Sequence, residues 1–268
     1  MTSIRTFCTV TLLLALAISS AVAAEISAAP DHHPGADILA QQFLPSTTRV
    51  NATPDAVLAT FLRRWQQQRS ALAEYSDTTV IHADLPDTSQ SGEYELHRRY
   101  VAPRTLEFKP VRFTGDGFVK TNIIIRLLQS EVDHVTKDDA ELTAIDESNY
   151  KFKHKFTLTS NSDGRVTYVY DVKPRKKRPG LFKGRIWVDA PTGVLTRVDG
   201  TLVKSPSFFI KHLDFVQEYQ EVDGFIMPTH LHSTSKVRIL GRAVVDIFHR
   251  DYQSTPATAL THMAAGAR

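Results

Sequence analysis

The sequence predicts an α+β fold in which one extended, curved antiparallel sheet has a few helices packed on one face. Three observations lead to this prediction: an early segment with helical spacing, a long series of segments with alternating apolar and polar residues, and turn motifs between those segments. Alternation with a period of two indicates a strand with one buried and one solvated face, as in antiparallel sheets. A helix followed by a run of consecutive strands is the order of an α+β domain.

The early helix is predicted over residues 53–73. Thr53 suits the N-cap, Pro54 the first helical position and Asp55 the positive end of the helix dipole. The apolar residues recur at helical intervals and form one stripe, made of Val57, Leu58, Phe61, Leu62 and Trp65. This stripe is expected to face the sheet.

Strands and one further helix follow in order. The strand over 93–101 places Tyr94, Leu96, Arg98 and Tyr100 on one side, and 105–109 alternates in the same way. Residues 122–135 change to helical spacing, which predicts a second helix. The clearest alternation lies at 151–159, where one face would hold Phe152, His154, Phe156 and Leu158 and the other Lys151, Lys153, Lys155 and Thr157.

The remaining chain is predicted to be a meander of strands. Asn161-Ser162-Asp163-Gly164, Pro191-Thr192-Gly193 and Asp223-Gly224 are turn sequences between alternating segments. The strands they delimit are predicted at 166–172, 185–190, 194–204, 208–222, 225–237 and 240–252. Neither a domain linker nor an internal repeat is evident.

The first residues indicate export. Arg5 precedes an apolar run over 9–20, and Ala21-Val22-Ala23 or Val22-Ala23-Ala24 supplies small residues for signal cleavage. About a dozen apolar residues are too few to span a bilayer, although an uncleaved N-terminal anchor is the alternative. The predicted organisation is a signal peptide at 1–24, a flexible lead-in at 25–52, one domain at 53–253 and a disordered tail at 254–268. The expected location is the periplasm.

Composition narrows the chemistry. The 32 basic and 29 acidic residues nearly balance, which gives no argument for a nucleic-acid partner. Cys8 is the sole cysteine and lies inside the signal, so the exported part has no thiol for a disulfide, a metal or a nucleophile. The fold must therefore be stabilised by its own core, and a monomer without cofactor is expected.

No residue set predicts catalysis or metal binding. The chain has no G-x-S-x-G elbow and no phosphate-binding glycine loop. His230 and His232 share a strand face, but zinc needs three or four converging ligands, so both are interpreted as polar surface positions. Asp138-Asp139 and Glu218 with Glu221 are interpreted as solvated surface. The prediction is a non-enzyme, and only a cluster of His154, His212 and His230 or His232 would reopen the question.

A basic run, capped by prolines, connects two predicted strands. It consists of Arg175, Lys176, Lys177 and Arg178. One interpretation is a solvated connection that opposes aggregation. The other is a contact with anionic lipid head groups, where each surface lysine or arginine contributes about 1 kcal/mol.

Several strands carry apolar residues on both faces, more than a few helices can cover. Phe208 and Phe209 point to opposite faces, and Trp187 lies opposite Ile186 and Val188. Such a surplus is typical of a cavity for an apolar ligand, although ordinary core packing explains any single residue.

The stretch from Gly184 to Gln253 resembles the C-terminal half of LolA-like outer-membrane lipoprotein-sorting proteins, and more narrowly a set of uncharacterised exported members. The resemblance is carried by Gly184-Arg185-Ile186-Trp187-Val188-Asp189, Thr192-Gly193, Arg197, Gly200, Pro206-Ser207-Phe208-Phe209, Tyr219, Gly224-Phe225, Pro228 and Arg238-Ile239-x-Gly241. It implies a half-open β-barrel of about eleven strands, closed by helices over an apolar cavity that holds acyl chains. In the family's sorting chaperone an arginine holds the helical lid shut, and these motifs match none of the present arginines to it.

These observations lead to a periplasmic carrier or sensor that binds lipid or lipoprotein acyl chains between sheet and helices. The expected cavity residues are Leu58, Leu62, Trp65, Trp187, Phe209, Leu213 and Phe215. Membrane proteins of the inner or outer membrane are the expected protein partners. The alternative is a structural or protein-interaction module of the envelope whose core is filled by side chains, and the volume of the cavity distinguishes the two.

Overall fold

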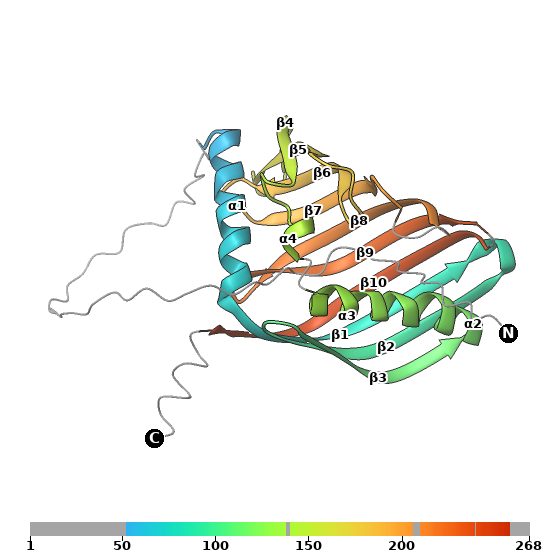
Figure 1. The fold of residues 1–268 in the computed structure, drawn as a ribbon. Coiled ribbons are helices and arrows are strands. Elements are labelled where there is room, and N and C mark those ends of the chain that lie inside the picture. Colours follow the sequence, from blue (N-terminus) through green and yellow to red (C-terminus); the bar gives the residue numbers. More distant parts are fainter. Residues whose placement is uncertain (1–51, 138–139, 206–209, 239, 258–268) are drawn as a thin grey trace, which may run out of the picture.

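The computed structural model describes residues 52–137, 140–205, 210–238 and 240–257. It confirms the predicted fold class, because one curved antiparallel sheet carries helices on one face (Figure 1). Among the described residues the sheet has ten strands rather than about eleven, in the order β3-β2-β1-β10-β9-β8-β7-β6-β5-β4. The sheet is open, with β3 and β4 as its edges. The predicted signal, all but the last residue of the lead-in, and 258–268 lie outside the described residues.

The first helix, α1, spans Pro54–Ala71. The Thr53 side chain caps it by accepting a hydrogen bond from the Ala56 backbone N–H at 3.3 Å. Val57 and Phe61 are buried on its inner stripe. The helix ends two residues before the predicted boundary because the chain passes directly into a strand at Leu72.

That strand, β1, spans Leu72–Leu85 and was not predicted. It lies inside the sheet between β2 and β10, with Tyr75, Asp77, Thr79 and Ile81 buried on its inner face. The alternation is obscured because two of these inward positions are polar. The sequence of β1 therefore lacks the alternation of apolar and polar residues that indicates a strand.

The other strands follow the predicted order with adjusted bounds: β2 Gln90–Val101, β3 Thr105–Gly115, β4 Tyr150–Thr159, β5 Val166–Pro174, β6 Phe182–Asp189, β7 Leu195–Leu202, β8 Ile210–Val222, β9 Phe225–Val237 and β10 Gly241–Pro256. A short 3₁₀ turn, η1, at Pro86–Thr88 joins β1 to β2. The last strand continues to Pro256, three residues past the predicted end of the domain.

The second predicted helix is a compound element. It begins with α2 at Gly117–Val119, passes through the π-helical turn η2 at Lys120–Ile124 and continues as α3 at Ile125–Lys137. A further short helix, α4, spans Ala140–Thr143. None of the helices in the described part of the chain combines the length and apolar character needed to cross a bilayer.

One prediction for β4 is wrong. A register shift lies between His154 and Phe156, so Phe156 is paired with Val169 and Leu158 with Thr167. Phe152 still packs against the core, whereas Phe156 and Leu158 are exposed on the outer face. A bulge of this kind reverses the side-chain alternation beyond it.

The main core lies between the inner face of the sheet and α1 and α3. Large side chains that are completely or almost completely buried include Phe61, Ile81, Leu96, Ile124, Tyr150, Tyr170, Ile186 and Leu195. A smaller cluster includes Tyr75 of β1, Tyr100 of β2 and Met227 of β9. Packing of this extent makes the inner face the place to look for a site.

Candidate functional site beneath helix α3

Helix α3 lies across the inner face of the sheet, in front of the strands at its β1–β2 side (Figure 1). Leu127, Leu128 and Glu131 of the helix face strand residues, and together they line a space of about 40 Å³. The strand residues around it are Thr79, Ile81, Arg98, Gln217, Pro228, Leu231, Ile247 and His249. The lining therefore combines the apolar Ile81, Leu127, Leu128, Pro228, Leu231 and Ile247 with a polar group made of Thr79, Arg98, Glu131, Gln217 and His249.

Arg98 is the centre of that polar group. Its side chain, 5 % exposed, points inward from β2. Its Nε donates to Asp77 Oδ2 at 2.7 Å, Nη1 to Glu131 Oε1 at 3.0 Å, and Nη2 to the Tyr252 hydroxyl at 3.2 Å. The guanidinium also lies over the Tyr75 ring, 5.2 Å from its centroid. One arginine thus connects three strands with helix α3.

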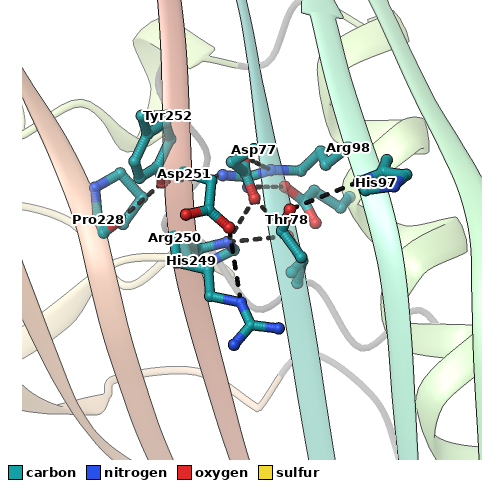
Figure 2. A network of polar contacts seen from close by, with 11 residues as sticks. Asp77, Thr78, His97, Arg98, Pro228, His249, Arg250, Asp251 and Tyr252 are labelled. Atoms are coloured by element: carbon teal, nitrogen blue, oxygen red, sulfur yellow. Dashed lines mark hydrogen bonds and ion pairs between the residues drawn. The ribbon is translucent and has the colours of Figure 1, made fainter.

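Asp77 accepts from the other side. The Thr79 hydroxyl donates to Asp77 Oδ1 at 2.5 Å, and His249 Nδ1 lies 3.2 Å from the same oxygen. Figure 2 shows Asp77, Arg98, His249 and Tyr252 brought together from adjacent strands. The Asp77 side chain is fully buried, and that of His249 is 8 % exposed. Asp77, Arg98, Glu131, His249 and Tyr252 are called the Arg98 network below.

Burial and charge act in opposite directions on this network. Burial raises the pKa of Asp77, but the Arg98 charge and hydrogen bonds from His249 and Thr79 outweigh it and hold the pKa well below its usual range. Burial, aided by the Arg98 charge, lowers the pKa of His249 to about 4. Burial raises the pKa of Glu131, and Arg98 offsets only part of that effect. At neutral pH the network therefore holds an ionised Asp77, a charged Arg98 and a neutral His249.

The Arg98–Glu131 bond is the polar contact of the network that joins the helix to the sheet. The other members, Asp77, His249 and Tyr252, belong to β1 and β10. Tyr252 extends the network to β9, since its hydroxyl donates to the Pro228 carbonyl at 2.7 Å. Mechanically, the arrangement can hold α3 on the sheet through one charge-assisted contact.

The structure separates the predicted cavity residues into groups. Leu58, Leu62 and Trp65 are partly buried against the main core, and Leu213 and Phe215 are buried within it. Leu62 and Trp65 also line a groove of about 600 Å³ between α1 and residues 141–148. Trp187 lies on the outer face, opposite Ile186, under the Arg197 guanidinium at 5.2 Å. Phe209 lies outside the described residues.

The two arginines of the basic run form hydrogen bonds within the protein, whereas its two lysines are exposed. Arg175 Nε donates to the Glu147 carbonyl at 2.7 Å, and Arg178 Nη2 donates to Asn149 Oδ1 at 2.7 Å. These bonds fasten the loop to the chain before β4. Lys176 and Lys177 remain exposed.

The histidines considered for metal binding do not converge. His154 lies against the Tyr168 and Tyr170 rings, and His212 Nε2 is 2.9 Å from Asp214 Oδ2. His230 and His232 both approach Asp246 Oδ1 at 2.9 Å on the outer face. Across residues 52–257, the described parts contain no group of three or more histidine, cysteine or acidic side chains arranged for a metal ion.

Sequence reasoning overlooked the Arg98 network, although one signal was present. The alternation places Arg98 on one strand face with Tyr94, Leu96 and Tyr100, and a charge beside such large side chains is the signal. Asp77 gave no comparable signal because β1 was not assigned. His249 lies more than 150 positions away from both.

Residues 146–254 match a family of unknown function, DUF5686. No curated protein matches the sequence. Among solved structures, the chain is similar to a LolA superfamily protein from Nitrosomonas europaea at 10 % identity and a TM-score of 0.38, over 73 % of this chain and 92 % of that one.

Two further solved structures are similar to this chain at comparable identity and TM-score. One is a domain assigned to an outer membrane lipoprotein-sorting protein from Vibrio parahaemolyticus, with 12 % identity, a TM-score of 0.40, and 74 % and 92 % coverage. The other is a DUF1329 family protein from Desulfovibrio piger, with 13 % identity, a TM-score of 0.38, and 75 % and 92 % coverage. Function is therefore inferred from the geometry of this chain itself.

Proposed function

We propose that this protein binds an apolar ligand, the acyl chains of a lipid or lipoprotein, between the inner face of the sheet and helix α3. Helix α3 acts as a movable cover, and Arg98 with Glu131 is its latch. The signal-like sequence of residues 1–24 supports a periplasmic location for this activity. The observation that carries the proposal is the charged contact between cover and sheet, beside a space that apolar side chains of both also line.

The Arg98 side chain is 5 % exposed and that of Glu131 is 21 % exposed, and an ion pair so largely removed from water is a poor way to stabilise a permanent interface. Well-packed apolar residues of similar volume are often equally or more stabilising, by 1–4 kcal/mol. An apolar pair at positions 98 and 131 would therefore hold a static helix at least as well. A charged latch suits a contact that breaks and re-forms, because water or a ligand head group can solvate both partners when the helix moves.

The start of the cover has a built-in irregularity. The π-helical turn η2 interrupts the regular hydrogen bonding immediately before α3. Such turns are frequent at functional sites and are places where a helix changes direction. Movement about η2 would lift Leu127, Leu128 and Glu131 together from the sheet.

The volume beneath the cover requires such a movement. Small-molecule pockets usually measure about 300–1,000 Å³, whereas the space beneath α3 is about 40 Å³. An acyl chain can therefore enter only when α3 is displaced. The residues then exposed include Ile81, Leu231 and Ile247, and each buried methylene of the ligand would contribute about 0.8 kcal/mol.

The two tryptophans of the chain allow a direct test. Trp65 packs against the main core on the inner side of the sheet, next to the Tyr219 ring, while Trp187 lies on the outer face. In the Trp187→Phe variant, a spin-labelled fatty acid should quench the remaining Trp65 fluorescence. In Trp65→Phe it should leave Trp187 fluorescence largely unchanged. Native mass spectrometry of purified protein should also detect co-bound lipid, and absence of both lipid and selective quenching would refute the proposal.

The small volume favours one other function. With about 40 Å³ beneath α3, the interior is nearly filled by side chains, as in a structural or protein-interaction module of the envelope. The Glu131→Ala variant distinguishes the two. A carrier should take up the fatty acid faster when the latch is removed, whereas a filled module should show no uptake in either form.

A further inference from the structure

Three lysines stand in a row on the outer face of the sheet, away from the covered site. Lys151 of β4 and Lys173 of β5 are direct cross-strand partners. Lys183 of β6 occupies the adjoining position, one residue before Gly184, which pairs with Val172. All three are exposed, and within the described residues none forms an ion pair. They are called the lysine row below.

The next row of the same strands is neutralised. Lys153 is paired with Asp171, Asp171 with Arg185, and Arg185 with Asp199. Lys155 Nζ and Arg185 Nε each lie 3.4 Å from an Asp171 oxygen. Like charges directly opposite one another are destabilising, whereas opposite charges stabilise a sheet. The lysine row thus carries an unfavourable repulsion that the adjacent row avoids, and an external anion would relieve it.

The lysine row borders a groove of about 1030 Å³ over the outer face of β5 to β8. Lys173 and Lys183 line the groove from the sheet, and Lys177 lines it from the basic run. Lysines of the basic run and of the lysine row therefore line the same groove. Gly184 and Gly200, which pair with each other, also line the groove and add no side chains to it.

Apolar groups are exposed beside these charges. Beyond the bulge in β4, Phe156 is 37 % exposed and Leu158 is 46 % exposed on the outer face. One edge strand thus presents Lys151 and Lys153 at one end and two large apolar side chains at the other. Flexible lysines with exposed apolar side chains match a surface that offers phosphates above hydrocarbon.

We infer that the lysine row, Lys176, Lys177 and the exposed Phe156 and Leu158 form a docking surface for an anionic phospholipid membrane. The lysines contact head-group phosphates, and the two apolar side chains enter the boundary with the acyl chains. An acidic protein segment could satisfy the lysines but would leave Phe156 and Leu158 without a role. The surface lies on the opposite face from helix α3, so its test does not depend on the function proposed for the covered site.

The experiment is sedimentation of the full chain with phosphatidylcholine vesicles, with and without phosphatidylglycerol. The wild-type protein should bind the mixed vesicles, and binding should weaken with added salt because surface charges are screened. The triple variant Lys151→Gln, Lys173→Gln, Lys183→Gln should lose about 100-fold in affinity, about fivefold per lysine. It should fold at least as stably as wild type, because a repulsion has been removed.

The matched control removes three exposed lysines elsewhere on the sheet, Lys109, Lys211 and Lys236, also to glutamine. It should retain more affinity than the lysine-row variant. A second variant, Phe156→Ser with Leu158→Ser, should weaken vesicle binding while leaving its salt dependence unchanged. Equal losses in the two lysine variants, or no preference for phosphatidylglycerol, would overturn the inference. Binding of polyglutamate through the lysine row without vesicle binding would also overturn it, in favour of an acidic partner.

Discussion

His249 is the residue through which the Arg98 network responds to pH. Its folded pKa is about 4, below the ordinary value of about 6.5. Between these values the unfolded chain binds a proton that the folded chain excludes, so stability falls as pH falls through this window. His249 should therefore make the free energy of unfolding about 3 kcal/mol lower near pH 4 than near neutral pH.

The measurement is urea denaturation across that range for wild type and His249→Gln. The variant should lose this part of the pH dependence while keeping the decline at lower pH that comes from Asp77. The lowered pKa of Asp77 acts only below its unfolded value of about 3.9, so the two effects are separable. An unchanged slope in His249→Gln would show that the imidazole is solvated or that other groups dominate.

The buried Tyr219 and the partly buried Tyr252 can be compared at the same scale. The Tyr252 hydroxyl donates to the Pro228 carbonyl and accepts from Arg98. The Tyr219 hydroxyl is buried and, within the described residues, has no hydrogen-bond partner. Tyr252→Phe should lower the free energy of unfolding by about 2 kcal/mol, whereas Tyr219→Phe should leave it unchanged or raise it by up to about 1 kcal/mol. A substantial loss for Tyr219→Phe in urea unfolding would show that its hydroxyl is satisfied in solution.

The environment of a single residue was predictable only where the pattern of its own strand or helix indicates it. Alternation placed Arg98 among Tyr94, Leu96 and Tyr100, which is where it lies. Its partners Asp77 and Glu131 come from elements that neither spacing nor composition connects to it. A contact between residues of distant strands depends on strand order and register, and neither can be read from a single sequence.

At the scale of elements, α3 is held by few polar bonds and should be separable from the sheet. Glu131→Ala removes the Arg98 Nη1 contact but leaves the Arg98–Asp77 pair in place. Losing a hydrogen bond to a charged group costs about 1.5–3 kcal/mol. Because that cost falls on the closed state of the helix, hydrogen exchange in 125–137 should accelerate by at least about tenfold.

Asp133→Ala is the control for this measurement. Asp133 lies on the same helix, but it contacts Gln129 and Lys137 of that helix. Its exchange pattern should match wild type, and the strands should be unaffected in both variants. Equal acceleration in the two variants would indicate a general loss of helix stability rather than release of a latch.

Elements were predictable where periodicity was undisturbed. The early helix, the second helix and the strands from β4 to β10 all lie where patterns indicated them, within a few residues. The failures are local and physical. β1 carries polar groups at buried positions, η2 adds a π turn that helical spacing does not show, and the bulge in β4 moves Phe156 to the outer face.

At the scale of the whole molecule, strand order determines which polar side chains come into contact. The insertion of β1 between β2 and β10 brings Asp77, Arg98 and His249 together, although the last two are separated by most of the chain. The same sheet places the network on one face and the lysine row on the other. The fold class followed from the sequence, but this two-sided division of charge did not, because it requires the registers of all the pairs.

The curvature of the sheet gives the last prediction. Gly184 and Gly200 are cross-strand partners in β6 and β7, and a Cβ on Gly184 would collide with the Asp199 carbonyl and the Gly200 backbone. Glycines inside strands mark bends or close backbone approaches. Gly184→Ala must therefore push β6 and β7 apart, at a cost of about 1–3 kcal/mol in the free energy of unfolding.

Gly117→Ala is the matched control, because a Cβ there meets no atom within 4 Å and the position begins a helix. Urea denaturation should show little change for it, or a gain of up to about 1 kcal/mol. Because Gly184 and Gly200 also line the groove beside the lysine row, Gly184→Ala should weaken vesicle binding as well as stability, while fatty-acid uptake on the other face persists. A variant that loses stability but binds vesicles normally would show that the spacing of β6 and β7 is needed for the fold and not for the membrane contact.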